Sequence, residues 1–222
     1  AKALAYTGAD RPIWTIYNWQ APLTIYLHAQ LWLLLNPLTG VGVGTLYAIT
    51  SVLAGLGFVY FLLCLSDCLG RNRLEKATIC GLVATTGSIQ LFFGYIENYT
   101  IMSTGVLLTL FLAVRCMRRE VSPAWPSLTL AVTNAFHPST IVLWPALLYM
   151  GWRLSENRDR PDNRRAEVWW HLTLPPLLVF LWLAVFMTAG GHSPMAMLQD
   201  DRPGGADGIP FVPLFTVTTE WQ

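Results

Sequence analysis

One acidic residue, Glu97, interrupts an otherwise uncharged stretch of the chain. It is the only charged residue between Lys76 and Arg115, a run of 38 residues rich in Leu, Ile, Val and Phe. A carboxylate in apolar surroundings can have a raised pKa and act as a general base, or it can bind a cation. Because such a group is costly in a membrane unless it meets water, a partner or a substrate, Glu97 is a candidate functional residue. The alternative is an ordinary turn residue in headgroup water.

Further polar and aromatic side chains surround Glu97 or precede it in the sequence. Tyr95, Asn98 and Tyr99 share its turn. Asp10 lies near the N-terminus in a segment with turn residues, followed by several Trp and Tyr side chains. Such rings anchor at the headgroup level of a membrane, and they also stack on sugars or lipid headgroups. Asp10 is therefore either an acidic site residue or a solvated loop acid.

A histidine lies on a short apolar segment near the N-terminus. His28 follows Tyr26 within Pro22–Asn36, an apolar stretch of about 15 residues that is too short to span a membrane alone. We expect this segment to lie at the interface or to re-enter the membrane in part. The His28 ring then either serves a site or bonds a neighbouring carbonyl.

A second histidine lies in a turn between two short apolar arms. The arms on either side of His137 contain about 12 and 13 residues and would reach only about 18–20 Å each as helices. The turn is therefore expected below the outer membrane surface, where irregular backbone is buried in protein or lines a wet cavity. Asn134, His137 and Ser139 either face such a cavity near Glu97 or cap freed carbonyls.

Composition indicates an integral membrane protein. Of the 222 residues, 54% are hydrophobic and only 12% are charged, whereas charged residues make up about a quarter of a typical soluble domain. No dense basic cluster with interleaved aromatic residues is present, so nucleic-acid binding is not expected. We predict an all-α, polytopic transmembrane helix bundle of about six crossings, including short paired helices, together with an interfacial helix.

The apolar segments and their breakers define these crossings. The uncharged run of 38 residues would reach about 57 Å as one helix, nearly twice a hydrocarbon core of about 30 Å, so it is expected to fold back near Glu97. The proline pair Pro175-Pro176 is expected to interrupt the last crossing. The predicted segments are Val41–Leu65, Ala77–Tyr95, Asn98–Val114, Trp125–Phe136, Ser139–Gly151 and Val168–Gly190.

We expect the chain to form a single transmembrane domain across residues 1–222. An external and interfacial segment covers 1–40, the helix bundle covers 41–190 and an external loop covers 191–222. No signal peptide or hydrophobic first helix precedes the first polar segment. Both ends are therefore expected to be cuts through a larger protein.

Basic residues predict the orientation of the bundle. Eleven of the 14 Lys and Arg residues lie in 66–76, 115–123 and 152–167, all on one side of the predicted crossings. The positive-inside rule makes that side cytoplasmic and the Glu97 side external. The four cysteines fall near the inner helix ends without a CxxC pair, which favours packing over metal binding.

The order of motifs resembles a known family. The stretch 21–28 (Ala-Pro-Leu-Thr-Ile-Tyr-Leu-His) is followed by 84–88 (Ala-Thr-Thr-Gly-Ser) and 92–99 (Phe-Phe-Gly-Tyr-Ile-Glu-Asn-Tyr). Then 135–138 (Ala-Phe-His-Pro) leads to 143–147 (Leu-Trp-Pro-Ala-Leu). Together these resemble bacterial polytopic glycosyltransferases of the GT-C type, related to the dolichyl-phosphate-mannose mannosyltransferases, over roughly residues 7–190.

The resemblance implies sugar transfer from a polyprenyl-phosphate donor at the external face of a bacterial inner membrane. It gives Asp10 the role of general base or contact to a divalent cation and makes Glu97 a second acidic residue. It also implies that His28 and His137 bind donor phosphate or acceptor. The remaining expected substrate-binding residues are Tyr26, Tyr95, Asn98 and Tyr99. The chain departs from the family pattern because it lacks the expected first helix and an acidic pair beside Asp10. It is thus either part of a longer enzyme or a reduced relative.

The alternative hypothesis is a non-catalytic accessory subunit of a larger membrane complex, for example a photosynthetic one. Such a subunit would bind lipid, pigment or neighbouring helices, and the 10 Trp, 8 Tyr and 10 Phe residues fit this role. In that setting His28 or His137 would ligate a chlorophyll magnesium. A transporter is disfavoured because the sequence shows no inverted repeat and only one intramembrane charge.

Overall fold

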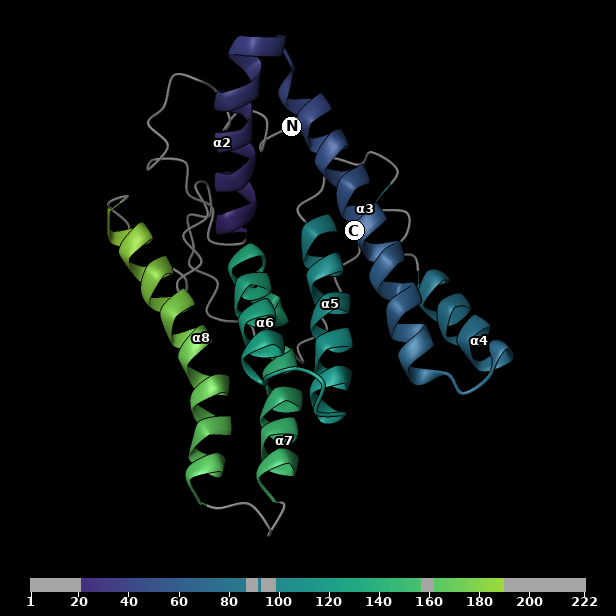
Figure 1. Cartoon of the computed structure of the whole chain (residues 1–222). Helices are drawn as coiled ribbons and strands as arrows, with labels where there is room; N and C mark the ends of the chain where they lie inside the picture. The colour runs from purple at the N-terminus through teal and green to yellow at the C-terminus, as the bar shows by residue number, and fades with distance from the viewer. Residues whose placement is uncertain (1–20, 87–91, 93–98, 157–161, 190–222) are drawn as a thin grey trace, which may run out of the picture.

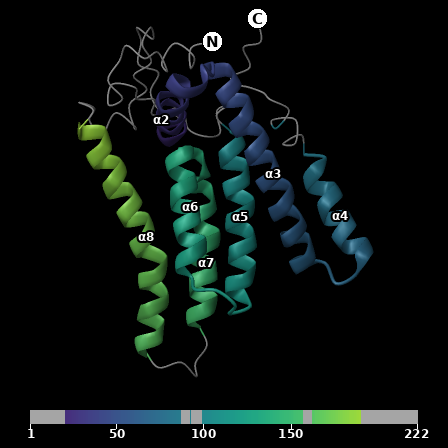
Figure 2. The ribbon, with the colours of Figure 1, turned by 45° about the horizontal axis from the view of Figure 1, so that its top comes forward.

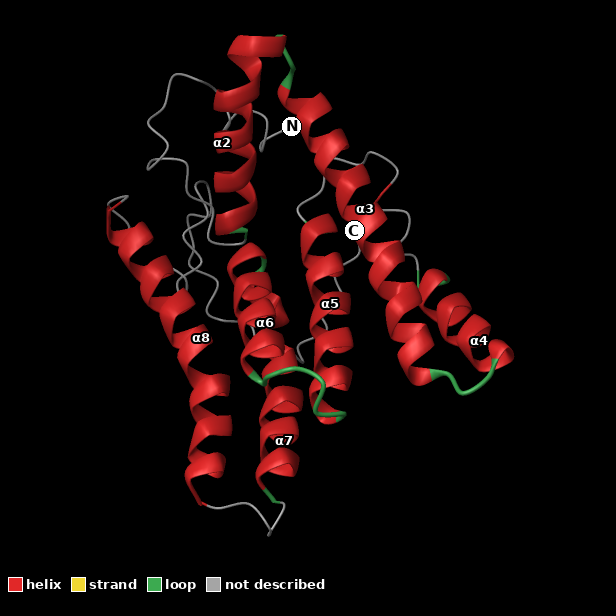
Figure 3. Ribbon diagram, in the orientation of Figure 1, coloured by secondary structure: helices red, strands yellow, loops and turns green. Residues whose placement is uncertain are grey.

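The computed structural model describes residues 21–86, 92, 99–156 and 162–189 (Figure 1). This part is 88% helical and has no strand (Figure 3), which confirms the all-α prediction. The helices are α2 (Pro22–Thr39), α3 (Val43–Leu69), α4 (Arg73–Ala84), α5 (Thr100–Met117), α6 (Ala124–Phe136), the 3-10 helix η3 (Pro138–Leu143), α7 (Trp144–Ser155) and α8 (Asp162–Ala189).

Among the described residues, three helices are long and apolar enough to cross a membrane. They are α3, α5 and the part of α8 from Arg165 to Val185. The prediction of about six crossings is not confirmed, because α4, α6 and α7 contain only 12, 13 and 12 residues. In place of the predicted crossing Ala77–Tyr95, the described helix ends at Ala84, and residues 87–91 and 93–98 lie outside the described part.

Four helices stand side by side in the order α3, α5, α6 and α8 (Figures 1 and 2). Helix α4 packs on the outer side of α3, and α7 packs against α8, η3 and α5. Helix α2 begins beside the end of α6, extends beyond it and packs against the beginning of α3. The segment Pro22–Asn36, predicted to be interfacial, is therefore helical, and its first turn adjoins one end of α6.

Small residues let two pairs of helices approach closely. A Cβ atom added at Gly105 of α5 would come within 3.0 Å of Thr133 Cγ2 on α6. Gly151 of α7 faces Leu172 of α8 in the same manner. In a bilayer, helices gain little from apolar burial, and close backbone packing at small residues helps to hold them together.

The predicted interruption at Pro175-Pro176 is wrong, because α8 runs through both prolines. Pro176 has no N–H to give to the carbonyl four residues earlier, which belongs to Leu172. The hydroxyl of Ser127 on α6 donates to this carbonyl oxygen at 2.6 Å. A neighbouring helix thus satisfies the freed group, which is how membrane helices tolerate internal proline.

The described basic residues gather at one end of the bundle, as their spacing in the sequence predicted. This end holds the ends of α3, α5 and α7 and the starts of α4, α6 and α8, at the bottom of Figure 1. Arg115 pairs with Glu120 at 2.7 Å, and Arg153 pairs with Glu156 at 3.0 Å. The turn between α2 and α3 lies at the opposite end.

Candidate functional site

The structure describes half of the predicted site residues. Tyr26, His28, Tyr99 and His137 are described, whereas Asp10, Tyr95, Glu97 and Asn98 lie outside the described part. The roles given to these four residues stay predictions. The described part of the site consists of His28, His137, Tyr26, Tyr99 and the helices that carry them.

His137 ends α6 in an extended conformation with φ −152° and ψ 111°. Its Nδ1 atom lies 2.7 Å from Ser139 Oγ and accepts the Ser139 backbone N–H at 3.4 Å. A backbone N–H can only donate, so Nδ1 is unprotonated and the neutral ring carries its proton on Nε2. Burial lowers the pKa of His137 from its ordinary value of 6.5, which favours this neutral form. In the described part of the chain, Nε2 has no hydrogen-bond partner.

Two of the predicted residues, Tyr99 and His137, are in contact. Their ring centroids lie 4.9 Å apart with an interplanar angle of 43°. Tyr99 immediately precedes α5 and follows Glu97 by two residues in the sequence. The junction between α6 and η3 therefore lies next to the residue at which the chain enters α5.

A buried amide lies one helical turn before His137. Asn134 is only 6% exposed, and its Oδ1 accepts a hydrogen bond from the hydroxyl of Thr140. Its Nδ2 is buried without a partner in the described part of the chain. Leaving a buried donor unpaired costs about 1–3 kcal/mol, so an oxygen atom of water or of a ligand would be stabilised here.

His28 connects α2 to α3. The ring is 2% exposed and stacks on Tyr47, with ring centroids 3.7 Å apart and an interplanar angle of 9°. Its Nδ1 lies 2.7 Å from the Thr24 carbonyl and must donate to it, so in the neutral ring Nε2 accepts from the Thr50 hydroxyl at 2.7 Å. Both ring nitrogens are thus engaged, and the side chain is well placed to hold α2 in position.

A second contact holds α2 on α6. The Thr24 hydroxyl donates to the backbone carbonyl of Phe136 at 3.2 Å. The last carbonyls of a helix have no partner within it, so this bond satisfies one of them. Tyr26 is half-buried on the same helix. Thr24 therefore places the start of α2 beside the junction that carries His137.

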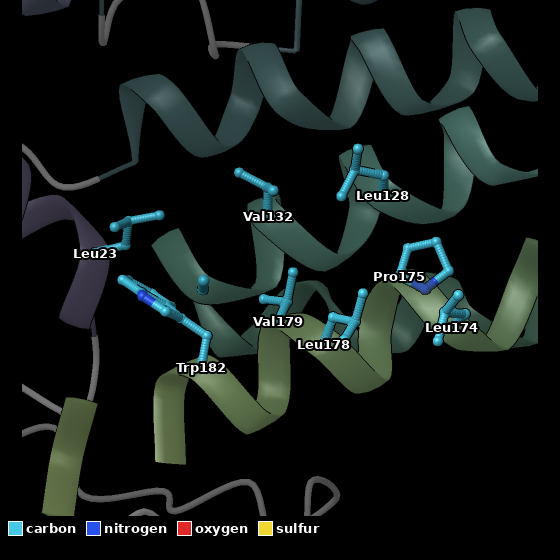
Figure 4. A pocket seen from close by; sticks show the side chains of 9 residues that line it. Leu23, Leu128, Val132, Leu174, Pro175, Leu178, Val179 and Trp182 are labelled. Carbon is cyan, nitrogen blue, oxygen red and sulfur yellow. The ribbon is translucent and has the colours of Figure 1, made fainter. Parts of the chain in front are cut away.

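An apolar groove runs between α6 and α8 (Figure 4). Its volume is about 450 Å³, and its outer end is formed by Leu23 of α2, Ala135 of α6 and Trp182 of α8. Along α8 it extends from Leu174 to Trp182, which is about 12 Å at 1.5 Å per residue. Ala135 precedes His137 by two residues, so the groove approaches the polar junction at one end.

The sequence did not reveal the groove or the partners of His28. Tyr47 and Thr50 are three positions apart on α3 and so share a helix face. The same spacing occurs in residues that contact lipid or pack in a core, so it does not identify them as partners of a histidine. Only the packing of α2 against α3 gives them a common partner, His28.

The described residues offer no obvious ligand set for a divalent cation. They contain no group of three or more His, Cys, Asp and Glu side chains that could hold a metal ion. The two acidic candidates, Asp10 and Glu97, lie outside them.

The chain matches no protein-family model, no curated protein and no solved structure.

Proposed function

We propose that the chain is a GT-C-like membrane protein that binds a polyprenyl-phosphate sugar donor and transfers the sugar at the outer end of the bundle. The observation that carries this proposal is the apolar groove between α6 and α8, which approaches the His137 junction. A lipid-linked substrate has a matching apolar part and polar part. Its hydrocarbon chain would lie in the groove, and its phosphate would lie at the polar junction.

The junction supplies donors that suit a phosphate. The Nε2–H of neutral His137 lacks a partner within the described residues, and the unpaired Nδ2–H₂ of Asn134 is buried behind it, where it could bond a phosphate only if the junction opened. Hydrogen bonds to phosphate oxygens are stronger than bonds between neutral groups because the acceptor is charged. The aromatic ring of Tyr99, in contact with His137, offers a surface on which a sugar can stack.

Asp10 is proposed as the general base, the role that the resemblance implies. The hydroxyl oxygen of the acceptor attacks the anomeric carbon of the donor sugar, and the bond from that carbon to the phosphate oxygen breaks. Asp10 takes the hydroxyl proton, and polyprenyl phosphate leaves with the bonding electron pair. Glu97 acts as the second acidic residue, and His137 holds the phosphate during the transfer.

The proposed orientation follows from the basic residues. The stretches 66–76, 115–123 and 152–167 face the cytoplasm, and the His137 junction faces the external side of a bacterial inner membrane. The gathering of the described basic residues at the end of the bundle opposite the α2–α3 turn supports this assignment.

Sugar transfer from a radiolabelled polyprenyl-phosphate donor tests the proposal with the full-length protein in lipid nanodiscs. Asp10→Asn should lower the rate roughly 10²–10⁴-fold, the usual contribution of a general base. Glu97→Gln should also reduce transfer, and His137→Gln should weaken donor binding about 10-fold. Glu156→Gln, at the opposite end, is the matched carboxylate control. Wild-type rates in both acidic variants would refute the site.

The second candidate function is that of an accessory subunit. It is favoured by a row of exposed apolar residues on α3, formed by Leu53, Leu56, Tyr60 and Leu63. Their spacing of three and four residues places them on one helix face, which suits a neighbouring helix or lipid. If a pigment were bound, His137 would be its ligand, because both ring nitrogens of His28 are engaged. Stable co-purification with other membrane proteins, without donor turnover, would favour this function.

A further inference from the structure

A second pocket lies at the basic end of the bundle, at the opposite end from His137. It has a volume of about 460 Å³ and is bordered by the end of α5, the start of α6, the end of α7 and the first turns of α8. Unlike the groove of Figure 4, it is lined by polar as well as apolar side chains. The polar ones that matter here are Arg119, Ser122, Glu167 and His171.

The backbone holds Arg119 in an unusual conformation at the edge of this pocket. Its φ of 64° is the only positive value at a non-glycine residue in the described part of the chain. The bonds from Arg119 N to Cys116 O and from Glu120 N to Arg115 O, both 2.9 Å, form a helix ending that normally carries glycine. A bulky residue with positive φ is strained, and such residues often mark functional sites.

Arg119 and Glu167 both line the pocket, yet they form no ion pair with each other. In the described part of the chain neither side chain has a hydrogen-bond or ion-pair partner within 4 Å. The nearby Arg115 and Arg153 differ, because each is paired with a glutamate. A pocket with one free cation and one free anion is complementary to a ligand that carries both charges.

Glu167 lies at the membrane-interface level of α8. The apolar span of that helix begins at Arg165, so Glu167 falls in its first turn and His171 one turn further on. Both side chains therefore lie where the membrane interface meets the pocket.

We propose that this pocket binds the headgroup of a zwitterionic phospholipid with a primary ammonium group, a phosphoethanolamine lipid. The phosphate lies on the Arg119 guanidinium, and the ammonium donates to the Glu167 carboxylate. Val121 and Leu154, which also line the pocket, contact the glycerol and the first methylenes. A phosphocholine lipid binds more weakly, because its quaternary ammonium has no N–H to donate.

The test uses the purified full chain in detergent, with lipid binding followed by native mass spectrometry. Wild-type protein should retain a diacyl phosphoethanolamine lipid at least 10-fold more tightly than the matching phosphocholine lipid. Arg119→Asn and Glu167→Gln should each reduce this preference at least 5-fold. Asparagine tolerates positive φ, so the first variant keeps the helix ending. Arg73→Gln and Glu156→Gln are the controls, since they change exposed charges at the same end of the bundle.

A competition experiment distinguishes an intact lipid from its soluble headgroup as the ligand. Soluble phosphoethanolamine should displace the lipid only at concentrations far above those of the lipid itself, because it lacks the apolar contacts. Equal affinity of the soluble compound would overturn the lipid assignment. An unchanged preference in both pocket variants would overturn the site, as would tighter binding of an anionic phospholipid than of the zwitterionic one. Circular dichroism and melting curves of each variant show that the fold is kept.

Discussion

The hydroxyl of Ser127 allows α8 to pass through two prolines. It is fully buried and donates to the Leu172 carbonyl that Pro176 leaves without a partner. Ser127→Ala should therefore lower the free energy of unfolding by about 1–2 kcal/mol, because a buried acceptor becomes unpaired. Denaturant titration of the protein in mixed micelles, followed by tryptophan fluorescence, measures this loss.

A double-mutant cycle separates the missing hydrogen bond from general packing effects. Pro176→Ala restores an N–H to the Leu172 carbonyl, so Ser127→Ala should cost less in that background than in the wild type. Thr129→Ala on the same helix is the control, since its hydroxyl donates only to the Trp125 carbonyl of its own helix. Equal costs of Ser127→Ala in both backgrounds would contradict the assigned bond.

The neutral state of His137 predicts how stability changes with pH. Burial lowers the pKa of this ring below 6.5, so between the folded and unfolded pKa values the unfolded chain binds more protons. The stabilising contribution of His137 is therefore present above about pH 6.5 and is lost as the pH falls through the lower folded pKa. Between pH 8 and pH 5 the Tm of wild type should fall further than that of His137→Gln. Parallel Tm curves for the two proteins would rule this out.

At the residue scale, chemical type and chain position predicted which side chains to examine, but not what they touch. His137 was singled out because a His-Pro-Ser turn between two short arms must be buried or line a cavity, and it does contact Tyr99. Nothing in the local sequence distinguishes a histidine with a free Nε2 from one with both nitrogens bonded. For His28 that distinction arises from Tyr47 and Thr50 on a different helix.

At the scale of elements, Gly105 controls how closely α5 and α6 approach. Gly105→Ala should destabilise the bundle by about 1–3 kcal/mol, because the new methyl group meets the buried Thr133 side chain and the helices must separate. Thermal unfolding in detergent measures the change. Combining it with Thr133→Ala should recover part of the loss.

Glycine at an open position provides the comparison. Gly81 of α4 has no atom within 4 Å of an added Cβ. Gly81→Ala should therefore be neutral or stabilising by up to about 1 kcal/mol, since alanine is the better helix former. Equal destabilisation by both substitutions would show that the Gly105 effect does not come from the α5–α6 contact.

The sequence predicts the long apolar helices well. It does not show that the short apolar segments form helices too short to cross a membrane. The predicted segments Val41–Leu65 and Asn98–Val114 correspond to α3 and α5 within a few residues, because continuous apolar runs with clear breakers determine them. For α8, proline was expected to break the helix. Its continuity depends on a hydroxyl contributed by α6, which is a tertiary contact and leaves no mark in the local sequence.

At the scale of the whole molecule, α2 links α3 to the end of α6. His28 attaches it to α3, and Thr24 attaches it to the end of α6. Between these helices lies α5, whose first residues adjoin Tyr99 and its contact to His137. Displacement of α2 would therefore uncover both the His137 junction and the outer end of the groove, where Leu23 is one of the lining residues.

The orientation of the whole bundle can be tested with two exposed positions at its opposite ends. Thr39 lies at the turn between α2 and α3, and Arg71 lies between α3 and α4 at the basic end. If the basic end faces the cytoplasm, a membrane-impermeant maleimide applied to intact cells should label Thr39→Cys and not Arg71→Cys. The native cysteines Cys64, Cys68, Cys80 and Cys116 are first replaced by alanine so that only the introduced thiol reacts. Permeabilised cells should label both variants, which confirms that each thiol is accessible. Labelling of Arg71→Cys alone in intact cells would reverse the orientation and place the His137 junction on the cytoplasmic side, where an external polyprenyl-linked donor could not reach it.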